Sequence, residues 1–108
     1  MGAMAAPIAP GKLEEWEAWV AELNGARKAE FNDMNQRFDV TEHRAWLQQS
    51  LDGQNTVIVV TDGPGGDEFL GKVMASDHEF DAWFREKVAE VHGIDLSAPP
   101  PPPAARWL

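Results

Sequence analysis

The chain has 108 residues, the size of one small domain, and 44% of them are hydrophobic, which is enough for a core and argues against disorder. Eighteen acidic residues against nine basic ones give a net charge of −9, which excludes nucleic acid and anionic membranes as partners, because phosphate binding needs a basic face. The chain has no cysteine, which excludes disulfides, thiolate nucleophiles and zinc–thiolate sites. The first ten residues lack a signal-peptide pattern and no apolar run reaches membrane-spanning length, so we expect a cytoplasmic protein.

A short strand and a long helix are predicted for the first part of the chain. Residues 3–9 are mildly apolar and end at Pro10 and Gly11, which favours a strand. Asn24 and Gly25 interrupt the helix that follows, and both a kink and a break into two helices fit this interruption. Side chains at intervals of three and four mark one face of that helix: Leu13, Trp16, Val20, Leu23, Arg27, Phe31, Met34 and Phe38.

Two strands joined by a tight turn are predicted next. Residues 42–49 form the first strand and residues 54–61 the second, and the Asp52–Gly53 pair between them is typical of a hairpin. The run Val57, Ile58, Val59, Val60 is continuous rather than alternating. We therefore expect both faces of this strand to be covered.

The last third of the chain is predicted to contain helices and a proline-rich end. One helix carries Phe69 and Leu70 on its apolar face, and the pattern Ser76-x-x-Glu79 predicts a capping box that begins another. Gly93 is expected to end that helix in the left-handed conformation. Residues 97–108 are expected to form a proline-rich strap, with residues 99–103 in a polyproline conformation and residues 104–108 as a short edge strand.

The order strand, helix, strand, strand, helix, strand is typical of the ferredoxin-like fold. It predicts a single α+β domain over residues 1–108, with a four-stranded antiparallel sheet that has helices on one face only. Because the strand at residues 57–60 is expected to be covered on both faces, we expect a homodimer that packs sheet to sheet.

At this level the chain resembles the dimeric α+β barrel superfamily, which includes antibiotic-biosynthesis monooxygenase-like, stress-responsive barrel and polyketide-cyclase-like domains. It is similar in particular to small bacterial proteins of uncharacterised function. The resemblance is carried by PGK and Trp16 at residues 10–16, WLQ at 46–48, SD, Phe80 and WF at 76–84, and HGID at 92–95. It implies a ligand site between the sheet and the helices or inside the barrel.

Polar residues on otherwise apolar stripes suggest a ligand site. Arg27 lies on the apolar row of the first helix with Glu30 three residues on, either as a surface ion pair or facing a pocket. Strand 42–49 is polar on both faces, which fits a lined cavity or a sheet edge. Arg44 and Trp46 could orient a ligand or stack on each other at the surface.

The histidines are the candidate proton carriers. His43 lies on the more apolar face of its strand. His92 either complements the dipole at a helix end or acts as a base, and the resemblance to haem-degrading relatives adds the role of axial haem ligand. His78 lies in a capping turn, where solvation is the simpler interpretation.

No motif signals a metal or a cofactor. Asp77, Glu79 and Asp81 overlap a helix start and lack the glycine turn of a calcium loop, so capping is the better interpretation. The glycine-rich segment 63–66 lacks the ending of a phosphate loop. We therefore expect neither a bound metal nor a cofactor.

These observations lead to two functional hypotheses. In the first, the protein binds a hydrophobic or anionic small molecule, as a cofactor-independent monooxygenase or a polyketide-cyclase-like enzyme. The candidate site then combines ligand-binding residues with proton carriers: Arg27, Arg44, Trp46, Gln48 and Trp83 for binding, and His43, His92 and Glu30 for catalysis. In the second, it is a non-catalytic accessory or stress-associated homodimer without a sizeable cavity. A haem protein is a third, weaker alternative.

The stretch 24–50 is where an anionic ligand is expected. It contains four basic and four acidic residues, so it is neutral within a chain of charge −9.

Overall fold

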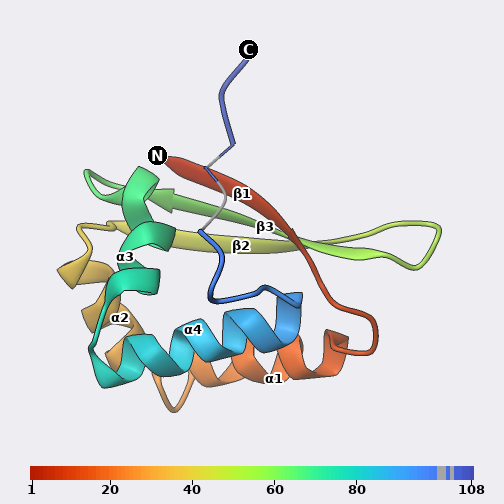
Figure 1. The fold of residues 1–108 in the computed structure, drawn as a ribbon, viewed down its shortest axis with the longest axis horizontal. Coiled ribbons are helices and arrows are strands. Elements are labelled where there is room, and N and C mark those ends of the chain that lie inside the picture. The colour runs from red at the N-terminus through yellow and green to blue at the C-terminus, as the bar shows by residue number, and fades with distance from the viewer. Residues whose placement is uncertain (100–101, 103) are drawn as a thin grey trace.

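A three-stranded antiparallel sheet forms one layer of the protein and helices form the other (Figure 1). The computed structural model describes residues 1–99, 102 and 104–108. In chain order the elements are β1 (Gly2–Pro7), α1 (Leu13–Asn24), α2 (Lys28–Arg37), β2 (Glu42–Gln49), β3 (Asn55–Asp62), the short 3-10 helix η1 (Gly66–Glu68), α3 (Phe69–Ala75) and α4 (Glu79–His92).

β3 is the central strand and pairs with β1 on one side and β2 on the other. The predicted hairpin between β2 and β3 is confirmed, with Gly53 at a φ of 87°, which favours glycine. Because side chains alternate along each strand, the register sets two faces. Ala6, Val57 and Leu47 belong to the inner face, and Ala5, Ile58 and Trp46 belong to the outer face.

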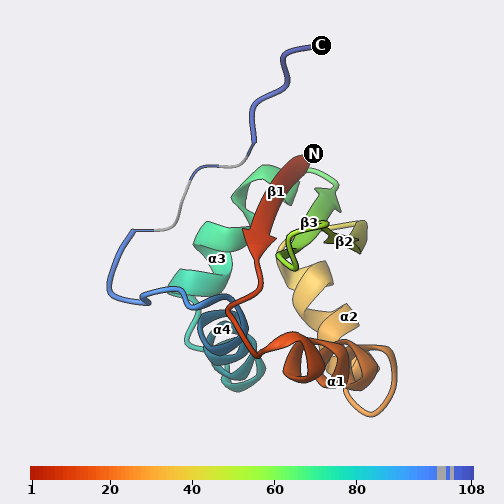
Figure 2. The ribbon, with the colours of Figure 1, turned by 90° about the vertical axis from the view of Figure 1, so that its right-hand side faces the viewer.

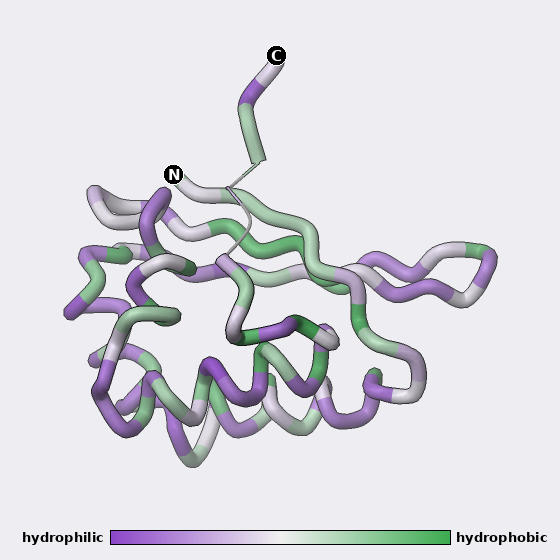
Figure 3. The backbone as a smooth tube through the Cα atoms, viewed as in Figure 1, coloured by the Kyte–Doolittle hydropathy of each residue, from purple (hydrophilic) through white to green (hydrophobic). Residues whose placement is uncertain are grey.

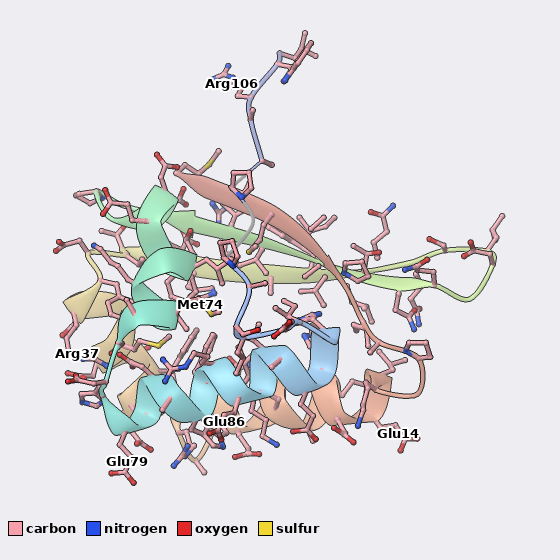
Figure 4. All side chains as sticks on the ribbon, in the orientation of Figure 1. Glu14, Arg37, Met74, Glu79, Glu86 and Arg106 are labelled. Atoms are coloured by element: carbon pink, nitrogen blue, oxygen red, sulfur yellow. The ribbon has the colours of Figure 1, made fainter. Side chains whose placement is uncertain are left out.

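The helices cover only the inner face. α1 and α4 lie side by side beneath the sheet, and α3 flanks it next to β1 (Figure 2). β3 is the most hydrophobic strand, whereas the helices alternate between polar and apolar residues (Figure 3). The acidic Glu14, Glu79 and Glu86 lie on the helix surface turned away from the sheet (Figure 4). None of the helices in the described part of the chain has the length and apolar composition to cross a membrane.

The long helix expected from residue 12 onwards is broken in two. α1 ends at Asn24, and α2 begins at Lys28 after a turn in which Arg27 N–H donates to the Glu22 carbonyl at 2.8 Å. Of the two alternatives at Asn24 and Gly25, the structure has the break. Because of the break, α2 can run in a different direction from α1. Its residue Met34 is fully buried in the core.

The predicted four-stranded ferredoxin-like sheet, and the dimeric barrel built on it, are wrong: the sheet has three strands. Residues 104–108 form no strand, and Ala104 N–H makes a single backbone hydrogen bond, to the Ala3 carbonyl of β1. This hydrogen bond cannot be extended into a ladder toward the preceding residues, because five consecutive prolines have no N–H to donate. Of the expected polyproline stretch, residues 100, 101 and 103 lie outside the described residues.

The helix ends differ in part from the expected caps. Gly93 ends α4 with a φ of 66°, which confirms the left-handed residue. The capping box at Ser76 is wrong, because α4 begins at Glu79 and Ser76 Oγ donates instead to Asp81 at 2.6 Å. Ser76 donates to Asp81 because this carboxylate is fully buried and must have hydrogen-bond donors.

An ion pair joins the end of α2 to the start of α4. Arg37 donates from both terminal nitrogens to Asp81, each at 2.7 Å, at the end of the helical layer where α4 begins (Figure 4). Burial raises the pKa of Asp81, but the hydrogen bonds from Arg37 and Ser76 outweigh it, so the pKa lies below its ordinary value. The carboxylate is therefore charged, buried and dependent on Arg37.

We predict that Arg37→Met lowers the free energy of unfolding by about 3 kcal/mol, because it leaves the Asp81 carboxylate buried without its cation. Lys28→Met, on the exposed start of α2, is the matched control and should change the free energy of unfolding by less than about 0.5 kcal/mol. Chemical denaturation of both variants measures the difference. Equal stability of the two variants would contradict a structural role for the pair.

Candidate functional site

A cavity of about 250 Å³ lies between the inner face of the sheet and the helices. None of the described residues that line it is charged. The sheet contributes His43, Met4 and Val59, and the helices contribute mainly aromatic side chains: Trp16 and Trp19 from α1, Phe31 from α2, Phe69 from α3 and Phe84 from α4. Such a lining suits an apolar, uncharged molecule.

His43 lies in the wall of this cavity among three phenylalanines. Its ring centre is 4.7 Å from that of Phe69, 5.0 Å from Phe31 and 6.5 Å from Phe84. Its Nδ1 lies 3.0 Å from Asn35 Oδ1, a buried carbonyl that can only accept. Nδ1 is therefore the protonated nitrogen, and Nε2 is left as an acceptor without a partner among the described residues.

The aromatic surroundings keep the His43 ring neutral. Burial lowers its pKa from 6.5 to about 4, because no nearby anion compensates for the lost hydration of an imidazolium ion. At neutral pH His43 therefore offers the cavity an uncharged hydrogen-bond acceptor.

His92 reaches the same cavity from the end of α4. Its Nδ1 lies 2.9 Å from the carbonyl oxygen of Pro7, which again places the proton on Nδ1. Burial lowers the pKa of His92 and the hydrogen bond to Pro7 opposes this, with a net lowering. The side chain thus ties the end of α4 to β1 and leaves Nε2 as a second neutral acceptor.

Trp19 provides the complementary donor. It packs edge-to-face on Phe84 at 4.9 Å and lines the cavity. Its indole Nε1–H is buried and has no hydrogen-bond partner among the described residues. An unpaired buried donor is costly, so a bound molecule with an acceptor group would relieve this cost.

The predicted pair Arg27 and Glu30 does not line the cavity. The two side chains form an ion pair at 3.4 Å on the helix surface, and Glu30 is half exposed. The Arg27 guanidinium lies 4.1 Å from the ring centre of Trp83 and 5.6 Å from that of Phe80. Arg27 and Trp83 therefore form a cation–π contact that packs α4 against the start of α2.

The candidate residues Arg44, Trp46 and Gln48 belong to the other face of the sheet. They alternate with His43, and that alternation places them on the outer face. Arg44 forms ion pairs with Asp62 and Glu42 and lies 5.6 Å from the Trp46 ring. The structure thus brings together His43 and His92 of the predicted set, and separates both from the arginines.

Two residues of the aromatic lining, Trp16 and Phe31, were identified at helical spacing. Spacing alone cannot distinguish a packed interior from a lined cavity. Trp19 and Asn35 were missed. Their signal was present: Trp19 follows Trp16 by three residues, and Asn35 is a polar residue next to the apolar position Met34.

The glycine-rich segment 63–66 has a packing role. Gly65 N–H donates to the Asp39 carbonyl at 3.0 Å, and a side chain on Gly65 would collide with the Phe38 carbonyl. Within the described residues, no three histidine or carboxylate side chains gather as a metal site.

Comparison with known proteins gives no relative: no family model, no curated protein and no solved structure matches the chain.

We predict that the protein loses stability as the pH falls from 6.5 to 4. In this window the unfolded chain protonates His43 and the folded one does not, so this group alone costs about 3 kcal/mol over the window, and His92 acts in the same direction. Urea unfolding at a series of pH values measures this loss of stability. In His43→Leu the free energy of unfolding should fall less steeply as the pH falls. In His78→Leu, which changes an exposed histidine, it should fall as steeply as in the unmodified protein. An undiminished slope in His43→Leu would contradict the buried neutral ring.

Proposed function

We propose that the protein binds a small, uncharged, mostly apolar molecule that carries a hydroxyl group, in the cavity between sheet and helices. The observation that supports this most directly is the His43–Asn35 pair, which holds an unpaired acceptor nitrogen among three aromatic rings. A hydroxyl can donate to His43 Nε2, and the same oxygen can accept from an indole N–H such as that of Trp19. A phenol meets both needs, and its ring fits an aromatic lining.

An anionic ligand is disfavoured by the same geometry. Arg27 and Arg44 lie outside the cavity, and each is already paired with a carboxylate. A carboxylate placed among aromatic rings without a cation would lose its hydration and gain no ion pair. Of the two ligand classes expected from the sequence, the hydrophobic one is therefore the one we propose.

Proton-transfer catalysis is the second candidate function. His43 lines both the cavity and a surface groove between α2 and β2, so it could pass a proton from a bound molecule to solvent. Such a step would begin the cofactor-independent oxygenation or cyclisation implied by the resemblance. A base with a pKa of about 4 is poorly matched to neutral pH, and for this reason we place binding first.

The binding proposal predicts that para-cresol binds more tightly than para-xylene, which replaces the hydroxyl by a methyl group. The preference should be about fivefold, the size of one net hydrogen bond, and His43→Leu should abolish it. Titration followed by NMR of the indole N–H signals measures both affinities, with His78→Leu as the control. Equal binding of the two compounds to the unmodified protein would overturn the proposal. Hydroxyl-dependent binding with catalytic turnover of a phenol would favour the second candidate.

We further propose that the protein is a homodimer that pairs through the outer face of the sheet. No helix in the part of the chain that the structure describes covers this face (Figure 2). It carries Ala5, Ile58 and Val60 in its middle, and Trp46 is 48% exposed beside them. Arg44 lies beside Val60 on this face and is paired with Asp62 and Glu42, so two copies can meet there with less repulsion than the chain's net charge of −9 would give. Sheet-on-sheet packing would cover these side chains.

Light scattering at micromolar concentration should then give twice the chain mass of 11.9 kDa. Ile58→Asp should halve the measured mass, because it would bury a carboxylate without a partner. Ala26→Asp, in the exposed turn between α1 and α2, should leave the mass unchanged. A monomeric unmodified protein would contradict this proposal. A dimer that binds no ligand would support the non-catalytic accessory role.

A further inference from the structure

A second cavity, of about 510 Å³, lies between the inner face of β1 and helix α3. The two elements are neighbours in both ribbon views (Figures 1 and 2). We call it the outer chamber and the cavity at His43 the inner chamber. Four residues line both: Met4, Val59, Phe69 and Leu70. The two chambers are therefore adjacent, with only these side chains between them.

Gly71 lines the outer chamber and has no side chain that would enter it. It lies in the middle of α3, where glycine is a poor helix former, and its backbone does not have the positive φ that would require glycine. A Cβ at this position would meet no atom within 4 Å. Neither backbone geometry nor packing within the chain accounts for this glycine, whereas a molecule lying over α3 would.

The charges at the outer chamber do not provide an anion site. Lys72 Nζ donates to the Phe38 carbonyl at 3.1 Å and lies 3.9 Å from Glu68. Asp67 and Glu68 outnumber this lysine in the lining. The chamber therefore suits an uncharged hydrocarbon end rather than a carboxylate or phosphate head group.

We propose that the ligand is elongated and occupies both chambers. Its hydroxyl end lies at His43, and its hydrocarbon remainder passes between Met4 and Leu70 into the chamber over Gly71. This inference rests on the binding function proposed above and names the ligand class: a neutral molecule with one polar end and a long apolar body. Of the residues near the C-terminus that the structure describes, Pro102 lines the chamber and Ala104 N–H donates to the Ala3 carbonyl.

A homologous series of para-alkylphenols tests the two-chamber site. Para-cresol can be held by the inner chamber alone, whereas in the proposed two-chamber site the alkyl chains of the butyl and hexyl homologues extend into the outer one. On the unmodified protein, calorimetric affinity should rise about fourfold for each added methylene, because each one leaves water.

Two substitutions at Gly71 provide the matched pair. Gly71→Phe places a ring in the open space and should lower the affinity for para-hexylphenol by at least about tenfold, while para-cresol binds as before. Gly71→Ala improves the helix but adds only one methyl group, and it should leave the whole series nearly unchanged. Gly71→Leu gives a second blocking variant if the phenylalanine protein does not fold, and circular dichroism checks each fold.

The outcomes separate this inference from the proposed function. A length-dependent gain that Gly71→Phe removes and Gly71→Ala preserves supports the two-chamber site. Binding of para-cresol with no gain for longer chains, or a gain that Gly71→Phe leaves intact, overturns it and leaves the inner site standing. Failure of every member of the series to bind the unmodified protein overturns the proposed function as well.

Discussion

β1 is an edge strand of the sheet in the described part of the chain, and the access to the space between the layers depends on this constraint. Ala104 makes one hydrogen bond to β1, and the five prolines before it have no N–H groups that could extend this bond into a ladder. The consequence is a sheet of three strands with an open side next to α3. The outer chamber lies on this side, between β1 and α3.

Two contacts, one near each end of α4, fix the position of this helix. At its start, Arg37 and Asp81 tie it to α2, and at its end His92 is bonded to the Pro7 carbonyl of β1. Between them, Phe84 packs edge-to-face on Trp19, and both rings line the cavity.

The chemistry of the inner chamber follows from dehydration. A histidine on a strand whose neighbours are phenylalanines has no anion to stabilise its charged form, so it stays neutral and one nitrogen remains an acceptor. The same dehydration makes the unpaired indole N–H of Trp19 costly. In the proposed function, the hydroxyl of the ligand would donate to His43, and an acceptor group on the ligand would relieve the cost at Trp19.

The sequence by itself determined the local elements. The β-branched run at residues 57–60 specified the central strand, Asp52 and Gly53 its hairpin, and the spacing of apolar residues the helices, because each depends on neighbours in the chain. It also indicated His43 and His92 as the chemical groups of interest. The alternation along strand 42–49 also placed Arg44 and His43 on opposite faces of the sheet. Only the tertiary structure decided which of these faces the helices cover, so that His43 lines the cavity, and that Arg27 stacks on Trp83 rather than facing a ligand. Sheet register and helix packing set these relations through long-range contacts, which local periodicity does not encode.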